Sequence, residues 1–375
     1  MKKVKLILII FAMAFAGCST LAQRSRTGVV VARRAQIRSS TAVVAADLLQ
    51  VNRGDVIQIL ESTDVPDPND NTRKERWLRV KAFDEDKTEG WIEARNVMPD
   101  DVLEAAKKLA AEDSSISAQA SGQLRASSNL RLTPDRSGND NIMMRLDSGS
   151  TFDIISWKRV AKPKSSESIE TDVAPKAGSA QPGTRANNNR QNDESTEPEE
   201  TNELWYKVRL PPAISPAPAG WIYGKQVELA VPSDIIFYRT GREFVAWQRL
   251  DADSKDNNSS TDKDGGRESK PGSWLILEKS SSNQPHSLDE PDFDRIYVLG
   301  YDKRSQEHYT AYRSPDLTGY LPAKVEGQGD NKSFVLRLQD DSGGVKDAQY
   351  SLYKDARGIL KVNAPAVAPR DRRRR

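Results

Sequence analysis

The chain has 375 residues, of which 37% are hydrophobic, and its mean hydropathy is -0.69. This length exceeds one typical domain and this hydropathy is low for a wholly compact protein, so we expect two or three modest domains joined by polar connectors. The 56 lysines and arginines almost balance the 54 acidic residues, so charge does not indicate a nucleic-acid binder.

The amino terminus has the layout of a secretory signal. Three lysines precede an apolar run of about ten residues, and small residues then lead to Cys18. The run is too short to span a bilayer as a stable helix. The segment "FAGC" resembles the lipobox of bacterial lipoproteins, with Phe15 in place of the usual leucine. An ordinary secretory signal with an incidental cysteine is the alternative.

The resemblance to lipoproteins implies that residues 1–17 are a removable signal peptide and that Cys18 carries a diacylglyceryl thioether and an acylated amino terminus, for example palmitate. Since each buried methylene adds about 0.8 kcal/mol of membrane affinity, three chains would anchor the protein stably. Ser19 stands where inner-membrane lipoproteins have aspartate, so the resemblance favours the outer membrane, facing the periplasm. The mature chain has no cysteine left for a disulfide or a thiol nucleophile.

Two stretches of the chain repeat one order of short elements. Residues 35–93 contain "AQIRSS", "NRGDVIQIL", "ERWLRV" and "EGWIE", and residues 128–223 contain "SNLRLT", "LDSGSTFDII", "ELWYKV" and "AGWIY". Each piece is a β-rich run or a glycine turn, and "WLRV" and "WYKV" alternate faces with period two. Short strands with polar connections predict a small antiparallel barrel in each copy.

This order of elements resembles the bacterial SH3-like domain, with its "LNVRxxP", "GxxxxVL", "WxKV" and "GWV" pattern. We therefore expect SH3-like barrels at residues 28–98 and 122–229. The resemblance implies modules that hold cell-wall peptide or glycan, or adaptors that bind proteins through barrel grooves and edge strands.

Polar segments connect and interrupt the barrels. Residues 99–121 are predicted as a helical connector, because "PDDVLEAAKKLAAED" starts with acids and has its lysines later. Residues 161–203 are rich in Ser, Pro, Asn and Glu, so we expect a disordered insertion that lengthens one hairpin of the second barrel. This insertion is either merely tolerated or a flexible interaction arm.

The C-terminal residues 231–364 do not repeat the unit. The runs "DIIFYR", "FVAWQRL", "SWLILEK", "RIYVLGY", "EHYTAYR", "SFVLRLQD", "QYSLYKD" and "GILKV" have the length and composition of strands. They predict an antiparallel sandwich or a meander barrel of no recognised family. The polar insertion at 251–272 lacks the spacing of a calcium loop, so we expect a solvated loop.

The basic tail at residues 365–375 ends in "PRDRRRR". It either attracts anionic headgroups or acidic polymers, at about 1 kcal/mol per charge at most, or has no dedicated partner.

No catalytic constellation stands out, so we expect a non-catalytic protein without a metal or cofactor. Cell-wall peptidases rely on Cys and His or on zinc, whereas the mature chain has only His286 and His308. We expect His286 in a solvated loop and His308 as a surface or core residue of a strand. A carboxylate-based cell-wall hydrolase stays a minor alternative, because acids carry no spacing signature.

Six aromatic side chains of the repeats are candidate ligand contacts. Period two places Trp205 opposite Tyr206 and Val208, so Trp205 would be a groove residue or a lid over the barrel end, and Tyr206 would face inward. The "GWI" aromatics are expected to act more as framework. The first-ranked candidates are Trp77, Trp205 and Tyr206, and the second-ranked are Trp91, Trp221 and Tyr223.

These observations predict a lipid-anchored cell-envelope protein whose SH3-like domains bind peptidoglycan. The expected partners are the membrane, through the lipid on Cys18, and peptidoglycan, with no nucleic acid. The alternative is a protein–protein adaptor or structural component of an envelope assembly.

Overall fold

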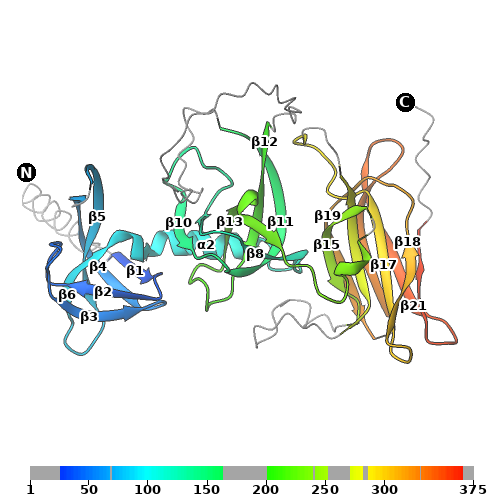
Figure 1. The fold of residues 1–375 in the computed structure, drawn as a ribbon, viewed down its shortest axis with the longest axis horizontal. Coiled ribbons are helices and arrows are strands. Elements are labelled where there is room, and N and C mark those ends of the chain that lie inside the picture. The colour runs from blue at the N-terminus through cyan, green and yellow to red at the C-terminus, as the bar shows by residue number, and fades with distance from the viewer. Residues whose placement is uncertain are drawn as a thin grey trace, which may run out of the picture. The chain divides into compact units, whose positions relative to one another are not determined.

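The computed structural model describes residues 26–67, 70–163, 201–239, 241–251, 271–281, 286–329 and 331–365 (Figure 1). Almost every element in these ranges is a β-strand, which confirms the all-β class expected from the sequence. The expected signal peptide with Cys18, most of both expected insertions and nearly all of the basic tail lie outside the described residues. The chain divides into two compact units, Met1–Leu103 and Glu104–Arg375.

The first unit contains one curled antiparallel sheet of seven strands. The strands are β1 (Arg26–Val30), β2 (Arg34–Arg38), β3 (Asp47–Asn52), β4 (Val56–Asp67), β5 (Asp70–Ala82), β6 (Glu89–Glu93) and β7 (Val97–Pro99). Their order across the sheet is β3-β2-β6-β5-β4-β1-β7. Side chains on one face pack into a core cluster made of Val30, Ala35, Ile37, Val51, Ile57, Leu78, Val80, Ala82, Ile92 and Val97.

The second unit begins its β structure with a sheet of the same design. The strands are β8 (Ala120–Leu124), β9 (Ser128–Arg131), β10 (Ile142–Leu146), β11 (Thr151–Ala161), β12 (Asn202–Arg209), β13 (Ala219–Tyr223) and β14 (Val227–Leu229). Their order, β10-β9-β13-β12-β11-β8-β14, is that of the first sheet strand for strand. Even the register shift recurs, after Ile59 in β4 and after Ile154 in β11. The repeat in the sequence therefore corresponds to one strand order used twice.

Two pairs of glycines explain part of the repeated pattern. Gly54 and Gly149 precede β4 and β11 with φ of 93° and 81°, a left-handed conformation that favours glycine. In "GWI", a Cβ on Gly90 would lie 2.5 Å from the Arg38 carbonyl oxygen, and one on Gly220 would lie 2.5 Å from the nearest core side chain. Glycine is thus needed where β6 and β13 approach their neighbours.

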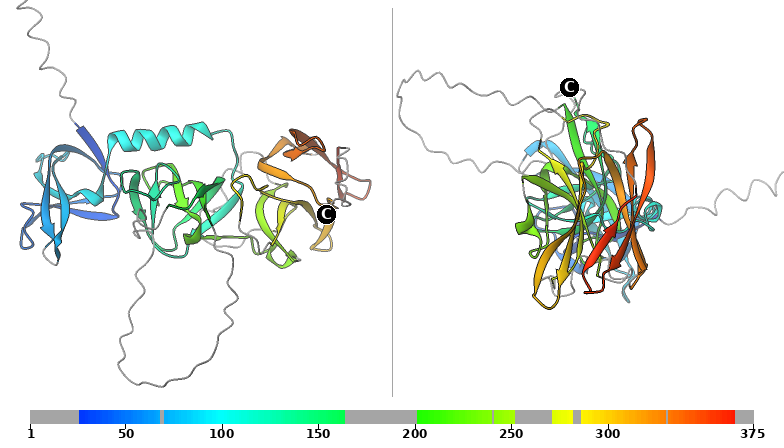
Figure 2. Two further views of the ribbon diagram at one scale, coloured as in Figure 1. Left: turned by 90° about the horizontal axis from the view of Figure 1, so that it is seen from above. Right: turned by 90° about the vertical axis from the view of Figure 1, so that its right-hand side faces the viewer.

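One helix, α2 (Asp100–Glu112), occupies the expected connector and is the cyan coil in Figure 2. Asp100 and Asp101 lie in its first turn, where the helix dipole favours negative charge. No helix in the described ranges is long and apolar enough to cross a membrane.

The hairpin β11–β12 carries the long insertion. Ala161 pairs with Asn202, and the Lys162 backbone N–H donates to the Thr201 carbonyl at 2.9 Å. The expected limits of 161 and 203 were too wide, because both terminal residues belong to the paired strands. Residues 164–200 lie outside the described part of the chain.

The C-terminal part of the second unit is a sandwich of two four-stranded antiparallel sheets, each a simple meander (Figure 1). The first sheet contains β15 (Arg242–Arg249), β16 (Trp274–Ser280), β17 (Arg295–Asp302) and β18 (Glu307–Arg313), and the second contains β19 (Gly319–Gln328), β20 (Asn331–Gln339), β21 (Val345–Lys354) and β22 (Leu360–Asn363). One buried cluster draws side chains from both sheets, for example Leu277, Val298, Phe334 and Tyr350.

Two strand predictions in this region were wrong. The run "DIIFYR" is a 3-10 helix over Ile236–Tyr238, because the N–H groups of Ile235 and Ile236 both bond back to the Pro232 carbonyl. This proline turn overrides the β propensity of the run. Strand β19, "GYLPAKVEGQ", was missed because Pro, Gly, Lys and Glu are depleted from strands, yet an edge position tolerates proline.

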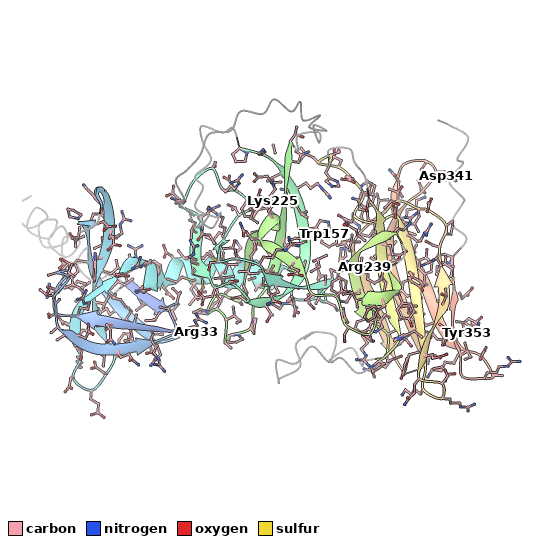
Figure 3. All side chains as sticks on the ribbon, in the orientation of Figure 1. Arg33, Trp157, Lys225, Arg239, Asp341 and Tyr353 are labelled. Atoms are coloured by element: carbon pink, nitrogen blue, oxygen red, sulfur yellow. The ribbon has the colours of Figure 1, made fainter. Side chains whose placement is uncertain are left out.

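Buried polar contacts join the second barrel to the sandwich. The carbonyl of Gln119, just before β8, accepts a hydrogen bond from the Trp247 N–H in β15 at 2.8 Å. Trp157 of β11, labelled in Figure 3, packs against the core cluster of the sandwich and donates from Nε1 to Asp292 Oδ1 at 2.6 Å. The Asp292 carboxylate also accepts the Leu321 N–H at 2.9 Å. The second barrel and the sandwich therefore form one continuous packed interface.

Candidate functional site

Strand alternation determines which side chains of the two barrels leave the core. In β5, Leu78 and Val80 belong to the core cluster, so Trp77 lies on the opposite face of the sheet. In β12, Trp205 likewise opposes the fully buried Val208. We call these opposite sides the outer faces of the first and second sheets.

The burial of the aromatic candidates does not follow their expected ranking. Trp205 is 0% exposed, and Trp77 and Tyr223 are each 5% exposed, so these rings are buried even though they lie on outer faces. Trp91 and Trp221, expected as framework, are only half-buried. The period-two argument placed the rings on the right face, but it could not show what covers that face.

In the second copy, an arginine lies over one of the buried rings, that of Tyr223. The guanidinium of Arg136, from the loop after β9, donates to Glu203 from Nε at 3.0 Å and from Nη2 at 2.6 Å. Its Cζ also lies 4.9 Å from the centre of the Tyr223 ring, which in turn lies 5.5 Å from the Trp205 ring. A carboxylate and an aromatic face thus hold one guanidinium, the geometry of a combined ion pair and cation–π contact.

The rest of that outer face is occupied by other residues of the same unit. Lys207 Nζ lies 2.5 Å from Asp113 and 3.4 Å from Glu112 at the end of α2, which leaves the Lys207 side chain only 9% exposed. The fully buried Arg131 donates to the Gly138 carbonyl at 2.7 Å. The two cations of this outer face are therefore bound by the chain itself, while Trp221 between them stays half-buried.

The equivalent face of the first sheet is more open. Arg79, which matches Lys207 in register, is 46% exposed, and it pairs with the exposed Glu61 and Glu89 at 3.3 and 3.6 Å. Arg79 and Arg38 are the cross-strand partners of Trp91. The first sheet thus presents a half-buried indole between two arginines.

The loop after β2 carries exposed apolar side chains and is bound by Arg38, the cross-strand partner of Trp91. Arg38 Nη2 donates to the Val43 carbonyl at 2.7 Å and to the Ala45 carbonyl at 3.2 Å, which fixes the loop after β2. Val43 and Val44 are exposed in this loop, Val44 at 93%, and Leu48 is exposed in the strand β3 that follows. A flat ring, two cations and apolar contacts can bind an extended ligand of mixed polarity.

Tyr206 faces the joint with the sandwich rather than an open groove. It is half-buried, and its ring meets Trp157 edge-on at 6.1 Å. Burial is the largest effect on its hydroxyl and raises the pKa of Tyr206 to about 12, with Glu243 adding to the rise and Arg159 opposing it. The Tyr206 side chain is therefore part of the packing between the second barrel and the sandwich.

The histidines lie in the sandwich and not on either outer face. His286 Nδ1 lies 2.6 Å from Glu290, whose pKa is lowered because hydrogen bonds from Lys279 and His286 outweigh its burial. His308, in β18, donates from Nε2 to the Gly272 carbonyl at 2.8 Å and packs against the ring of Tyr238. Among the described residues, no group of three His, Cys, Asp or Glu side chains could hold a metal ion.

Sequence reasoning missed the acidic member of each outer face. Glu75 and Glu203 stand two residues before Trp77 and Trp205, in "ERW" and "ELW", and alternation puts each glutamate beside its tryptophan. The repeated Glu-x-Trp spacing was a visible signal. Arg136 left none, because its loop has no counterpart of equal length in the first copy.

No protein-family model matches this chain, and no curated protein matches it.

Proposed function

We propose that this chain is a non-catalytic, lipid-anchored protein of the bacterial cell envelope and that its first SH3-like barrel binds cell-wall peptide or glycan. The resemblance of "FAGC" to a lipobox supports an anchor at Cys18, on the outer membrane and facing the periplasm. The observation that carries the binding proposal is the difference between the two outer faces. Arg79 is exposed in the first copy, whereas its counterpart Lys207 is sealed by acids at the end of α2.

In this proposal, Trp91 is the main contact of the ligand. An indole offers a large rigid surface at low entropic cost, which suits the apolar face of a sugar or an extended peptide. Arg38, Arg79 and Glu89 supply donors and acceptors around it. Trp221 occupies the matching position of the second sheet, beside Arg131 and Lys207. Because these two cations are buried, we assign the second copy a structural role.

Retention on purified peptidoglycan sacculi tests the proposal. The protein of residues 19–375 is expected to co-sediment above a serum albumin control, and Trp91→Ala is expected to reduce this several-fold. Trp221→Ala is the matched control and should leave retention unchanged. Equal loss in both variants, or no retention above albumin, would contradict binding by the first barrel. Melting curves of both variants show whether each has kept its fold.

A protein–protein adaptor is the second candidate, and one observation favours it. Strand β3 lies at the edge of the first sheet with Leu48 exposed, so its free backbone groups could pair with a strand of another protein. Cross-linking in intact cells to one defined envelope protein, without retention on sacculi, would support this role over wall binding.

Labelling with an alkyne fatty acid tests the anchor separately. We expect the wild-type protein to be labelled and Cys18→Ala to be unlabelled and released from the membrane fraction. An unlabelled wild type would remove the argument for the envelope location.

A further inference from the structure

We propose that the first barrel binds an arginine side chain of a basic polypeptide at Glu75 and Glu93, in the position where the second barrel holds its own Arg136. This site lies next to Trp91 on the same outer face but uses carboxylates in place of the indole, so the inference goes beyond binding of the cell wall. It rests on the equivalence of the two sheets and on the one guanidinium that the second sheet is seen to hold.

The cross-strand register establishes the equivalence residue by residue. Trp77 pairs with Glu93 between β5 and β6, as Trp205 pairs with Tyr223 between β12 and β13. One step along, Arg79 pairs with Trp91 as Lys207 pairs with Trp221. Glu75 and Glu203 therefore occupy the same position beside the buried indole of their sheet.

The second copy shows which chemistry this position selects. Arg136 and Glu203 have side chains that are 10% and 3% exposed, so the pair is almost sealed from water. The guanidinium reaches both carboxylate oxygens, at 3.0 and 3.1 Å from Nε, and covers the Tyr223 ring. A planar fork that pairs with a carboxylate and lies on a ring is the geometry of arginine and not of the compact lysine ammonium.

In the first copy, the two carboxylates pair with an exposed arginine that follows β6. Arg95 is the cation at this place, yet its side chain is 70% exposed and its Nη1 lies 3.9 Å from Glu75. Its firmer contact is with Glu93, at 2.6 Å from Nε. Exposed pairs of this kind contribute little, so an incoming guanidinium can replace Arg95 at Glu75. Glu93 in place of Tyr223 adds a second carboxylate, which increases the preference for a cation.

Fluorescence anisotropy with a labelled peptide tests the site. The probe is the hexapeptide Gly-Ser-Arg-Arg-Ser-Gly, and its partner replaces both arginines with citrulline, which keeps the shape and removes the charge. With the protein of residues 19–375, we expect the arginine peptide to bind at least tenfold more tightly than the citrulline peptide. Glu75→Gln is expected to weaken binding about tenfold, as the loss of a charge-assisted contact predicts. Glu93→Gln is a second variant in case Glu75→Gln does not fold.

Glu85→Gln is the matched control, because Glu85 is an exposed carboxylate of the same barrel away from Trp77. Its affinity for the arginine peptide should equal that of the wild type. Equal weakening by Glu85→Gln would show general charge attraction and overturn the proposal, as would wild-type affinity in both Glu75→Gln and Glu93→Gln. Trp91→Ala should keep peptide binding, so failure of the cell-wall proposal and failure of this one are distinguishable.

Discussion

Gln119 binds both backbone groups of Ala323 as a neighbouring strand residue would. Its Oε1 accepts the Ala323 N–H at 2.7 Å and its Nε2 donates to the Ala323 carbonyl at 3.0 Å. Because its own carbonyl accepts the Trp247 N–H, this one residue links the edge strands β15 and β19 of the sandwich. Gln119 thus supplies the partner of the Ala323 N–H, while the Ala323 carbonyl also accepts a hydrogen bond from Gln248 of the sandwich at 3.0 Å.

We expect Gln119→Ala to destabilise the second unit by about 1–3 kcal/mol, since the buried N–H of Ala323 loses its partner. Urea unfolding followed by tryptophan fluorescence measures the change. Gln349→Ala removes an exposed glutamine of the same unit and should change the free energy of unfolding by less than about 0.5 kcal/mol. An unfolding midpoint for Gln119→Ala equal to that of Gln349→Ala would contradict a structural role of the link.

We expect Arg136→Ala to cost about 3–5 kcal/mol, because it leaves the buried carboxylate of Glu203 without its cation. Millimolar methylguanidinium should then raise the melting temperature of Arg136→Ala by several degrees, and millimolar methylammonium should raise it less. Arg145→Ala, at an exposed arginine, should be neither destabilised nor rescued. A melting temperature unaffected by methylguanidinium would show that Glu203 and Tyr223 do not form a guanidinium site.

The two "GWI" glycines should respond differently to alanine. A Cβ on Gly90 meets a backbone oxygen, that of Arg38, which cannot move without shifting β2, whereas one on Gly220 first meets the flexible end of Met143. We expect Gly220→Ala to cost about 1–3 kcal/mol and Gly90→Ala to cost more. Gly138→Ala, where a Cβ meets nothing within 4 Å, should be close to neutral in the same unfolding assay. A larger loss for Gly220→Ala than for Gly90→Ala would be the opposite of this expectation.

Tyr206 should give the second unit a specific sensitivity to alkali. Burial raises its pKa to about 12 in the folded state, whereas an unfolded tyrosine ionises near about 10. The folded state therefore favours the protonated hydroxyl, and this stability is fully present below about pH 10 and is lost as the pH rises toward 12. Tyr206→Phe should lose less stability over that interval. The difference in phenolate absorbance between wild type and Tyr206→Phe should rise near pH 12. A rise near about pH 10 in a protein that is still folded would refute the burial argument.

The repeat was predictable because it depends on local patterns that survive in both copies. Glycine turns, period-two alternation and the "GWI" contacts each need a particular residue type, so they mark the strands directly in the sequence. Strand β19 has no such pattern, because its residues have a low β propensity. It is a strand because it pairs with β20 and packs on the sandwich core.

The candidate site was predictable only in part. Alternation places Trp205 on the outer face, but it does not show that the ring is fully buried there against Tyr223. Tyr223 is in turn covered by Arg136, which stands sixty-nine positions before Trp205 in the chain. Coverage by a distant segment is a tertiary property, which no single strand encodes. The same limit hid Gln119, whose partner Ala323 lies 204 positions away.

The strand ends of the β11–β12 hairpin are paired at the point where the insertion begins and ends, so the second barrel is suited to accept an inserted domain there. The chain leaves β11 and re-enters β12 at the adjacent positions Lys162 and Thr201, where the Lys162 N–H donates to the Thr201 carbonyl at 2.9 Å. A folded reporter whose own ends lie close together could be spliced between them without altering the register of Ala161 and Asn202. The inserted domain would then extend from the β11–β12 hairpin, which packs on the sandwich through Trp157.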